Sequence, residues 1–455
     1  MALAETARVR NSASHTSGGA VGGSLTFDRG HFGLSADTYD SRYGTVAEED
    51  VTIRMKRDHL GLAGEIKGLP GFIRAVRGQV NRTVYRHREI GGAGAVGTTF
   101  ATRGTEARLE AEHAPIGALR GVVGVQAEHF NFSALGAEAF VPSTRTQRSA
   151  VFGLEELKWG HGTLTAGARI EHAKVDSAGD ADPAMPKFGD PLNRSFTLRS
   201  FSLANVADLA PGWKLSAGWS FTERAPTFYE LYANGLHVAT AAFEVGDAAL
   251  AKERGHNVDV GVQWKRGASS ARIGGFVNRF SNYIALEATG GTAAAGSGAA
   301  APVYAFRGVH ARLVGVEIEA RQRLVDAPWA WEATGKLDYV RATNLDSGEP
   351  LPRVAPLRAL LGIEATGGPW RARVEIDHSA RQDRVPATDT ATAGHTLVNL
   401  SLTRSLEVGD ARALAFVKLT NAGNALAYSA STIQTVRDLA PLPGRALKVG
   451  VRVSF

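Results

Sequence analysis

The sequence predicts an all-β chain that folds as a transmembrane antiparallel β-barrel with about 19 strands. Three observations support this prediction. Apolar and polar residues alternate with a period of two along many segments, tight turns alternate with long connections, and many strands are longer than those of soluble sheets. Together these observations describe long strands that each have one apolar and one polar face.

The composition excludes several other classes of protein. The chain has 455 residues, a formal net charge of +6, 44% hydrophobic residues and 21% charged residues, which excludes a disordered chain. No apolar run approaches the ~18 residues that a membrane-spanning helix requires. The absence of cysteine excludes a disulfide framework, a thiolate metal site and a cysteine nucleophile. Positive and negative charges are interspersed without a basic run, so we expect no nucleic-acid partner.

The start of the chain carries no targeting pattern. Residues 1–8 show no basic segment followed by an apolar core, so we expect no signal peptide here. Either the chain is cytoplasmic, or its export signal lies upstream of this sequence. We therefore assign residues 1–15 to an N-terminal remnant and residues 16–455 to the barrel.

The period of two is clearest at the end of the chain. One face of the last predicted strand carries Leu447, Val449, Val451, Val453 and Phe455. The other face carries the polar Lys448 and Arg452, as expected for a strand whose successive side chains point to opposite faces. The same alternation occurs earlier in the chain at 213–222, 257–265, 316–323 and 373–381. Two segments, 196–208 and 411–419, alternate poorly and are assigned as strands from their context.

The connections between the predicted strands are of two kinds. Tight turns with Gly, Pro and Asp occur at 28–30, 68–71, 114–117, 160–162, 210–212, 326–328 and 366–369. Long polar or Gly/Ala-rich connections occur at about 88–97, 132–145, 176–195, 223–253, 285–303, 342–354, 382–395 and 420–445. Short and long connections alternate along the chain. This is typical of outer-membrane barrels, which have short periplasmic turns and longer extracellular loops.

The length of the strands indicates which face meets lipid. Soluble strands have a mode of ~5–6 residues, whereas a tilted membrane strand needs ~9–11 to cross the hydrocarbon. Side chains could not fill so large a cylinder, so we expect the apolar face to point outward and the polar face to line the lumen. The direction of the first strand, at about 19–27, fits a barrel of 22 strands with its first strands missing. An open barrel would leave unpaired edges in lipid, so we expect the chain to be a fragment.

Several sequence motifs resemble one family. The longest is FTERAPTFYELYANGLHVAT from Phe221, followed by FEVGD from Phe243, and KERGHN from Lys252 leads into the next strand. The C-terminal part contains LTNAGNA from Leu419 and PLPGR from Pro441. With these motifs, residues 16–455 resemble the barrel of TonB-dependent outer-membrane receptors. HAPIG at 113–117, GVQ at 124–126 and PGF at 70–72 resemble the branch that imports zinc.

The resemblance implies a function and a set of partners. It implies a receptor in the cell outer membrane that takes up a scarce ligand, either a metal ion such as zinc or a metal chelate such as a siderophore or haem. Uptake in the family is energised by the TonB–ExbB–ExbD complex through a plug domain, and neither the plug nor a TonB box is found in this sequence. We expect a monomer, surrounded by outer-membrane lipid and inserted by the barrel-assembly machinery. The alternative is an unplugged diffusion channel or a non-functional barrel fragment.

The resemblance also implies a binding site at the extracellular rim. Glu89 ends one predicted strand and His237 lies in the long loop that follows Phe221, and the resemblance implies that both are metal ligands, together with acidic plug residues. Carboxylate and neutral imidazole groups suit zinc. The neighbouring candidates for ligand binding are His87, Glu230, Tyr232 and Asn234. The alternative is that Glu89 is a solvated charge and His237 packs within its loop, in which residues 225–232 form a short helix after Pro226.

No motif indicates an enzyme. The glycines at 92, 94 and 97 match the spacing of a dinucleotide-binding fingerprint, but that fingerprint opens a helix and residues 98–112 have the pattern of a strand. No metalloprotease, serine-hydrolase or Walker motif occurs. We expect no resident cofactor, and zinc only as a transported ligand.

Overall fold

The computed structural model describes residues 8–180, 186–294, 300–409 and 411–454. These residues form 21 strands, two short α-helices and one 3-10 turn. None of the helices in this part of the chain is long and apolar enough to cross a membrane. Phe455, the predicted last residue of the final strand, lies outside the described residues.

The elements follow one another with few interruptions. In chain order they are β1 (Ser14–Phe27), β2 (Gly30–Thr45), β3 (Glu48–Lys67), β4 (Ile73–Ile90), β5 (Val96–His113), β6 (Leu119–Gly136), β7 (Thr144–Trp159), β8 (Gly162–Ser177), β9 (Leu192–Ala210), β10 (Trp213–Arg224), α1 (Phe228–Tyr232), β11 (Asn234–His237), η1 (Val238–Thr240), β12 (Ala242–Val245), β13 (Glu253–Arg266), β14 (Ser269–Ala294), β15 (Ala300–Val325), β16 (Ala330–Asn344), β17 (Arg358–Gly367), β18 (Trp370–Ser379), β19 (His395–Val408), β20 (Ala411–Thr420), α2 (Gln434–Arg437) and β21 (Ala446–Ser454).

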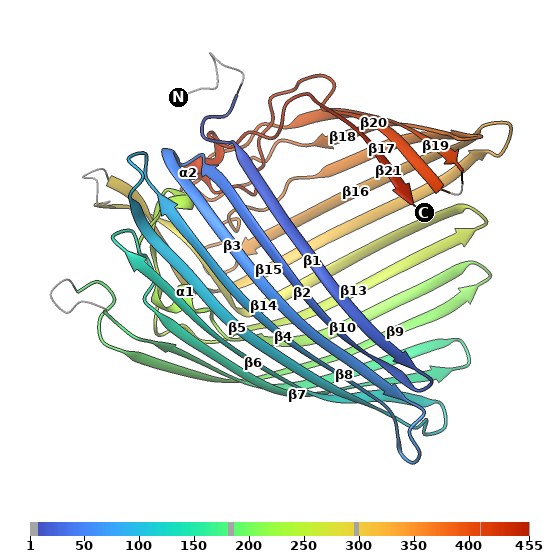
Figure 1. The fold of residues 1–455 in the computed structure, drawn as a ribbon, viewed down its shortest axis with the longest axis horizontal. Helices are drawn as coiled ribbons and strands as arrows, with labels where there is room; N and C mark the ends of the chain where they lie inside the picture. The colour runs from blue at the N-terminus through green and yellow to red at the C-terminus, as the bar shows by residue number, and fades with distance from the viewer. Residues whose placement is uncertain (1–7, 181–185, 295–299, 410, 455) are drawn as a thin grey trace. The chain divides into compact units, whose positions relative to one another are not determined.

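The chain divides into two compact units. The first comprises Met1–Ala204, Trp219–His256 and Arg279–Ala311, and the second comprises Asn205–Gly218, Asn257–Asn278 and Arg312–Phe455. In the first unit, each strand from β1 to β8 pairs with the next in antiparallel register, and Figure 1 shows them side by side in blue to green. In the second unit, β16 to β21 form an antiparallel series of the same kind.

The two faces of the first unit differ sharply in polarity. One register row on the apolar face consists of Leu25, Phe32, Gly64, Gly78, Leu109, Val125, Val151 and Ile170. These side chains are exposed, with Leu25 at 70% and Val151 at 63%. The opposite face carries ion pairs, such as Arg77 with the buried Glu65. Exposed apolar groups and paired charges on the other face reverse the pattern of a soluble sheet, as the sequence predicts for a membrane barrel.

The number of strands agrees with the prediction, although their lengths differ. Two of the 21 strands, β11 and β12, have only four residues each and lie inside one loop, so 19 remain in the described chain. The poorly alternating segments 196–208 and 411–419 lie in β9 and β20, which confirms their assignment from context.

Several predicted long loops are shorter in the structure. Residues 88–90 and 96–97, expected in one loop, extend β4 and β5. β14 and β15 likewise extend to Ala294 and from Ala300. Backbone pairing continues beyond the apolar band, where small and polar residues no longer show the alternation that marks a strand in the sequence. Short and long connections therefore do not alternate strictly, since both 68–72 and 91–95 have five residues.

We use two names for the ends of these strands. The turn end is the end at which β1 joins β2 and β3 joins β4. The loop end is the end at which β4 joins β5 and β8 joins β9, and it carries the connections 91–95, 137–143 and 178–191.

The two faces of β21 provide a direct test of this arrangement. Val451 is 64% exposed on the apolar face and pairs with Ala415, whereas Arg452 lies on the opposite face and pairs with Leu414. Val451→Arg should destabilise the membrane-inserted state by ~2–4 kcal/mol, because it places a charge among lipid chains. Arg452→Gln should leave stability nearly unchanged. Denaturant unfolding in lipid vesicles would measure both, and equal effects would contradict the assignment of faces.

Candidate functional site

The loop that joins β10 to β13 begins with the predicted short helix. Within residues 225–252, α1 starts at Phe228, and Glu230 accepts a hydrogen bond from the backbone N–H of Thr227 at 2.7 Å. A side-chain acceptor for the first free N–H groups stabilises a helix start, so the carboxylate is part of the reason that these few residues are helical. The sequence prediction of a helix after Pro226 is confirmed.

Three of the predicted ligand-binding residues fix this loop to the rest of the first unit. Glu230 is 6% exposed and accepts hydrogen bonds from both terminal nitrogens of Arg224, at 2.8 and 3.1 Å. The Tyr232 hydroxyl donates to the backbone carbonyl of Val175 at 2.9 Å. The Asn234 side chain donates to the carbonyl of Lys187 at 2.6 Å. Their polar atoms therefore already have partners within the protein, and a direct role in ligand binding stays a prediction.

His237 lies at the end of a small hairpin within the same loop. β11 and β12 pair antiparallel, with His237 opposite Ala242, and β12 adds to β15 in parallel through Phe243 and Val303. This pairing gives a loop residue the fixed backbone of a sheet. The imidazole stacks on Phe140, with ring centroids 4.3 Å apart and planes 12° apart. Stacking of this kind holds the plane of the ring.

A buried carboxylate orients the His237 ring. Nδ1 of His237 lies 2.9 Å from Oε1 of Glu244, which also accepts a hydrogen bond from the Thr240 hydroxyl at 2.9 Å. Glu244 is 4% exposed. An ionised carboxylate only accepts hydrogen bonds, so toward an ionised Glu244 it is Nδ1 that donates, and Nε2 is the ring nitrogen left to meet a ligand. A carboxylate that fixes the tautomer and raises ring basicity is the usual support of a metal-binding histidine.

Glu89 is buried at the loop end of β4. β4 has 18 residues, against the ~9–11 that cross the hydrocarbon, and Glu89 lies one residue from its end, beyond the apolar stretch that finishes at Val84. Its side chain is 8% exposed, and its Oε2 atom is buried without a hydrogen-bond partner. Burial is the main cause that raises the pKa of Glu89 to about 7; Glu138 and Glu48 contribute to this rise, and His237 opposes it.

These electrostatic effects indicate which groups share the site. Glu138 lies in the connection 137–143, and its backbone N–H donates to the Thr98 hydroxyl at 3.2 Å. A Cβ added at Gly97 would lie 3.3 Å from the Glu138 carboxylate, so the missing side chain permits this close approach. We call Glu48, Glu89 and Glu138 the acidic cluster. The last glycine of the 92–97 motif therefore has a packing role beside this cluster.

A row of rings links the predicted residue His87 to His237. His87 stacks on Phe100 at 4.4 Å and lies 2.9 Å, through Nδ1, from the Tyr85 hydroxyl. Phe100 lies 6.4 Å from Phe140, on which His237 stacks. Phe100 is 7% exposed and packs with Ala134 and Ala139. His87 therefore belongs to the wall that positions the site, and the structure provides no test of its role as a ligand.

The described residues do not assemble a complete metal centre. Among them, no group of three or more His, Asp or Glu side chains is arranged to hold a metal ion. Glu89 and His237 are brought to the same region, as their electrostatic interaction indicates, and their role as ligands stays a prediction. Sequence reasoning missed Glu48, Glu138 and Glu244. Only Glu244 had a signal, because it lies in the FEVGD stretch that supports the family resemblance.

Comparison with known proteins identifies the family. Residues 5–421 match the family model described as "TonB dependent receptor-like, beta-barrel". The chain belongs to this family. The resemblance to TonB-dependent receptors is thereby confirmed, as is the all-β barrel of that type, whereas the likeness to the zinc-importing branch stays a prediction.

Solved structures have the same fold. The chain is 20% identical to "Copper transporter OprC", with a TM-score of 0.82 over 97% of this chain and 72% of that one. It is 15% identical to the FrpB iron transporter from Neisseria meningitidis, with a TM-score of 0.72 over 96% of this chain and 71% of that one. It is 14% identical to the siderophore receptor PirA from Pseudomonas aeruginosa, with a TM-score of 0.66 over 97% and 71%. At these identities the likeness extends to the fold alone.

The raised pKa of Glu89 predicts a pH-dependent stability. Its contribution to folding is fully present below the ordinary pKa of 4.5 and is lost as the pH rises through about 7, since the folded state resists ionisation. Glu89→Gln should therefore stabilise the receptor barrel at about pH 8 by up to about 3 kcal/mol, and leave it nearly unchanged at about pH 4.

Denaturant unfolding at both pH values measures this difference. Glu156→Gln is the matched control, because Glu156 is an exposed carboxylate outside the acidic cluster. If both variants gain the same free energy of unfolding at the higher pH, Glu89 is not the group responsible for the pH dependence.

Proposed function

We propose that this receptor barrel takes up a metal ion or a metal chelate across the cell outer membrane, energised by TonB. Family membership supports a receptor of this class, and solved structures of the same fold are named as a copper transporter, an iron transporter and a siderophore receptor. The observation that carries the proposal is the environment of His237. Buried Glu244 holds Nδ1 of this histidine, and the histidine is close enough to Glu89 to lower the pKa of that carboxyl. We propose no catalytic activity.

The acidic cluster favours a cation as cargo. Glu138 and Glu48 both raise the pKa of Glu89, which means that the three carboxylates repel one another when ionised. A divalent cation would relieve this repulsion and would satisfy the unpartnered Oε2 of Glu89. An anionic chelate would add to the repulsion unless other groups contacted it.

Zinc is the first metal to test. A neutral imidazole and a carboxylate are both good zinc ligands, and structural or catalytic zinc sites use three or four protein ligands. His237 and Glu89 supply two of them, so we propose that a plug domain supplies the remainder, as the family resemblance implies. Copper binds such nitrogen and oxygen sites more tightly than zinc, so affinity alone does not establish the cargo.

We propose the partners that this function requires. TonB–ExbB–ExbD would act through the plug, the barrel-assembly machinery would insert the chain, and a single copy would function surrounded by outer-membrane lipid. The competing function is an unplugged diffusion channel or a barrel remnant without transport. The two functions differ in whether uptake requires the energy that TonB supplies.

Removal of His237 tests the metal site. Zinc is titrated by calorimetry into the chain alone and into the chain joined to its plug domain. The chain alone should bind zinc weakly, the plug should raise affinity, and His237→Ala should remove most of that gain. Glu244→Gln should weaken zinc binding by ~10–100-fold, because it removes the group that orients the imidazole.

A distant histidine is the control for these titrations. His161 is exposed in the tight turn after β7, so His161→Ala should leave zinc binding unchanged. If no zinc binds, or if binding is indifferent to Glu89 and His237, the zinc proposal fails. Siderophore and haem would then be the leading ligands, and the fold would be unaffected.

Uptake in cells tests the energised mechanism. Labelled zinc should enter cells that produce the receptor only when TonB is present, and the rate should saturate at low zinc concentration. A diffusion channel would instead give uptake that is independent of TonB and proportional to concentration. A cell that produces His237→Ala is the control for uptake through the proposed site.

A further inference from the structure

The apolar face of β1 to β5 ends abruptly toward the loop end. Val21, Ala36, Leu60 and Arg82 stand opposite one another on β1 to β4. Counted toward the loop end, theirs is the last register row in which most side chains are apolar. Above it on the same face Arg103 stands opposite Val84, and the two rows beyond contain five more cationic side chains, which we call the basic patch: Arg42, Arg54, Lys56, Arg86 and Arg88. All five are exposed, and all belong to the first unit.

The basic patch places like charges directly opposite one another. Arg54 pairs across the sheet with Arg42 on one side and with Arg88 on the other. In the next row, Lys56 pairs with Arg86. Like charges in directly opposed positions of an antiparallel sheet destabilise it. A bound anion would therefore stabilise the sheet at these three pairs, which lie in two adjacent rows.

The protein supplies little counter-charge on this face. Lys56 lies 3.6 Å from Asp58, whose other oxygen accepts a hydrogen bond from the Thr38 hydroxyl at 2.7 Å. Asp40 stands opposite Lys56 in the neighbouring strand. Within the described chain, Arg42, Arg54, Arg86 and Arg88 form no ion pair.

Arginines on the other face of the same strands behave differently. Arg57, next to Lys56 in sequence, forms an ion pair with Asp37, and Arg77 forms one with Glu65. The chain therefore pairs its arginines where they face inward. The unpaired arginines gather on the face that carries the exposed apolar band.

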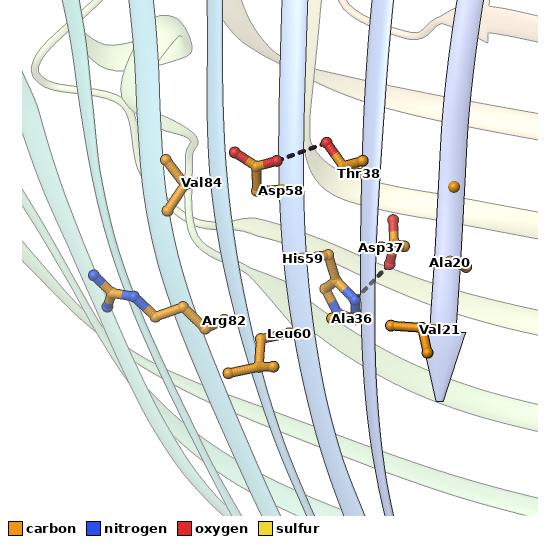
Figure 2. Close-up of a pocket in the computed structure, with 11 residues that line it drawn as sticks. Ala20, Val21, Ala36, Asp37, Thr38, Asp58, His59, Leu60, Arg82 and Val84 are labelled. Atoms are coloured by element: carbon orange, nitrogen blue, oxygen red, sulfur yellow. Dashed lines mark hydrogen bonds and ion pairs between the residues drawn. The ribbon is translucent and has the colours of Figure 1, made fainter. Parts of the chain in front are cut away.

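An apolar groove lies directly below the basic patch. Figure 2 shows two register rows that line it, Val21, Ala36, Leu60 and Arg82 in one, and Thr38, Asp58 and Val84 in the other. Gly19 has no side chain and Ala36 only a methyl group, which leaves the space, while Val21, Leu60 and Val84 form its apolar wall. Val21 is 73% exposed and Leu60 is 49% exposed, so this wall is open to the surroundings.

We propose that the basic patch binds the phosphate groups of a phosphorylated glycolipid in the outer leaflet, with its acyl chains along the groove. This rests on the proposed location in the outer membrane. Guanidinium groups bind phosphate oxygens in bidentate fashion, and cations beside an apolar surface attract anionic headgroups. The apolar groove adjoining the cations matches an amphiphile better than a soluble anion. The patch is separate from the metal site, because Arg88 and Glu89 are successive residues on opposite faces of β4.

The test compares two pairs of arginines at opposite ends of the strands of the first unit. Arg54→Gln with Arg88→Gln removes the centre of the basic patch. The matched control is Arg29→Gln with Arg74→Gln, which removes two exposed arginines at the turn end. The detergent-solubilised chain is titrated with bisphosphorylated lipid A, with the same glycolipid lacking phosphates, and with inorganic phosphate, and binding is measured by native mass spectrometry.

The expected result is a loss of glycolipid affinity that occurs only when the glycolipid carries phosphates. The double substitution in the basic patch should weaken binding of bisphosphorylated lipid A about 30-fold, and the control should leave it unchanged. Without glycolipid, the variant should unfold at the same or a higher denaturant concentration than the original chain, since like-charge pairs are relieved. A lower unfolding concentration would instead mean that these arginines stabilise the sheet themselves, which overturns the inference.

Other outcomes would also overturn it. Equal losses in both double variants would indicate a general charge effect, and inorganic phosphate that binds as well as the lipid would indicate a free-anion site. The same samples are titrated with zinc. A receptor that binds zinc through His237 without phosphate-dependent glycolipid binding overturns this inference alone. If the glycolipid binds and zinc does not, this inference is supported and the proposed metal cargo is contradicted.

Discussion

The structure depends on the pairing of backbone N–H and C=O groups within long antiparallel ladders, because hydrocarbon offers no water to replace a missing partner. β2 and β3 illustrate the point, since they stay in register from Gly30 opposite Ile66 to Gly44 opposite Thr52. Once the register is set, the period of two assigns each side chain to a face, and a slip by one residue would exchange the faces. The exposed apolar rows and the inward ion pairs are both consequences of this single constraint.

The same ladders position the candidate site. β4 and β5 remain paired past the apolar band, and at the loop end their register shifts between Glu89 and Ile90, so the acidic side chain sits where the regular ladder ends. Bulges of this kind re-aim side chains and are common beside functional sites. The stacked rings of Phe140 and His237 join two loops, and Phe140 in turn lies beside Phe100 of β5. The site is thus built from the loop ends of β3 and β4, the connection 137–143, and the loop that contains the small hairpin of β11 and β12.

The sequence allowed prediction wherever a local rule decides the structure. The faces of Val451 and Arg452 follow from alternation, and α1 follows from Pro226 with an acidic residue in the first turn. Glu89 and His237 came from motif resemblance, since nothing in their spacing brings residues 148 positions apart together. Glu138 was not predicted, because its place beside Glu89 depends on a loop folding over Gly97, which leaves no periodic signal. The loop-end extensions of β14 and β15 were missed for a similar reason, as alternation weakens once neither face meets lipid.

Arg88 and Glu89 show how the pleat creates binding capacity on both faces of one strand. As neighbours in sequence they could neutralise each other in a helix cap or a turn, but a strand sends successive side chains to opposite sides. Glu89 is therefore buried with an unpartnered carboxylate oxygen, and Arg88 is exposed without an acidic partner among the described residues. An uncompensated charge on either face lowers stability until an outside ion compensates it. One strand end can therefore favour a cation on its inner face and a phosphate on its outer face, with the backbone ladder keeping the two apart.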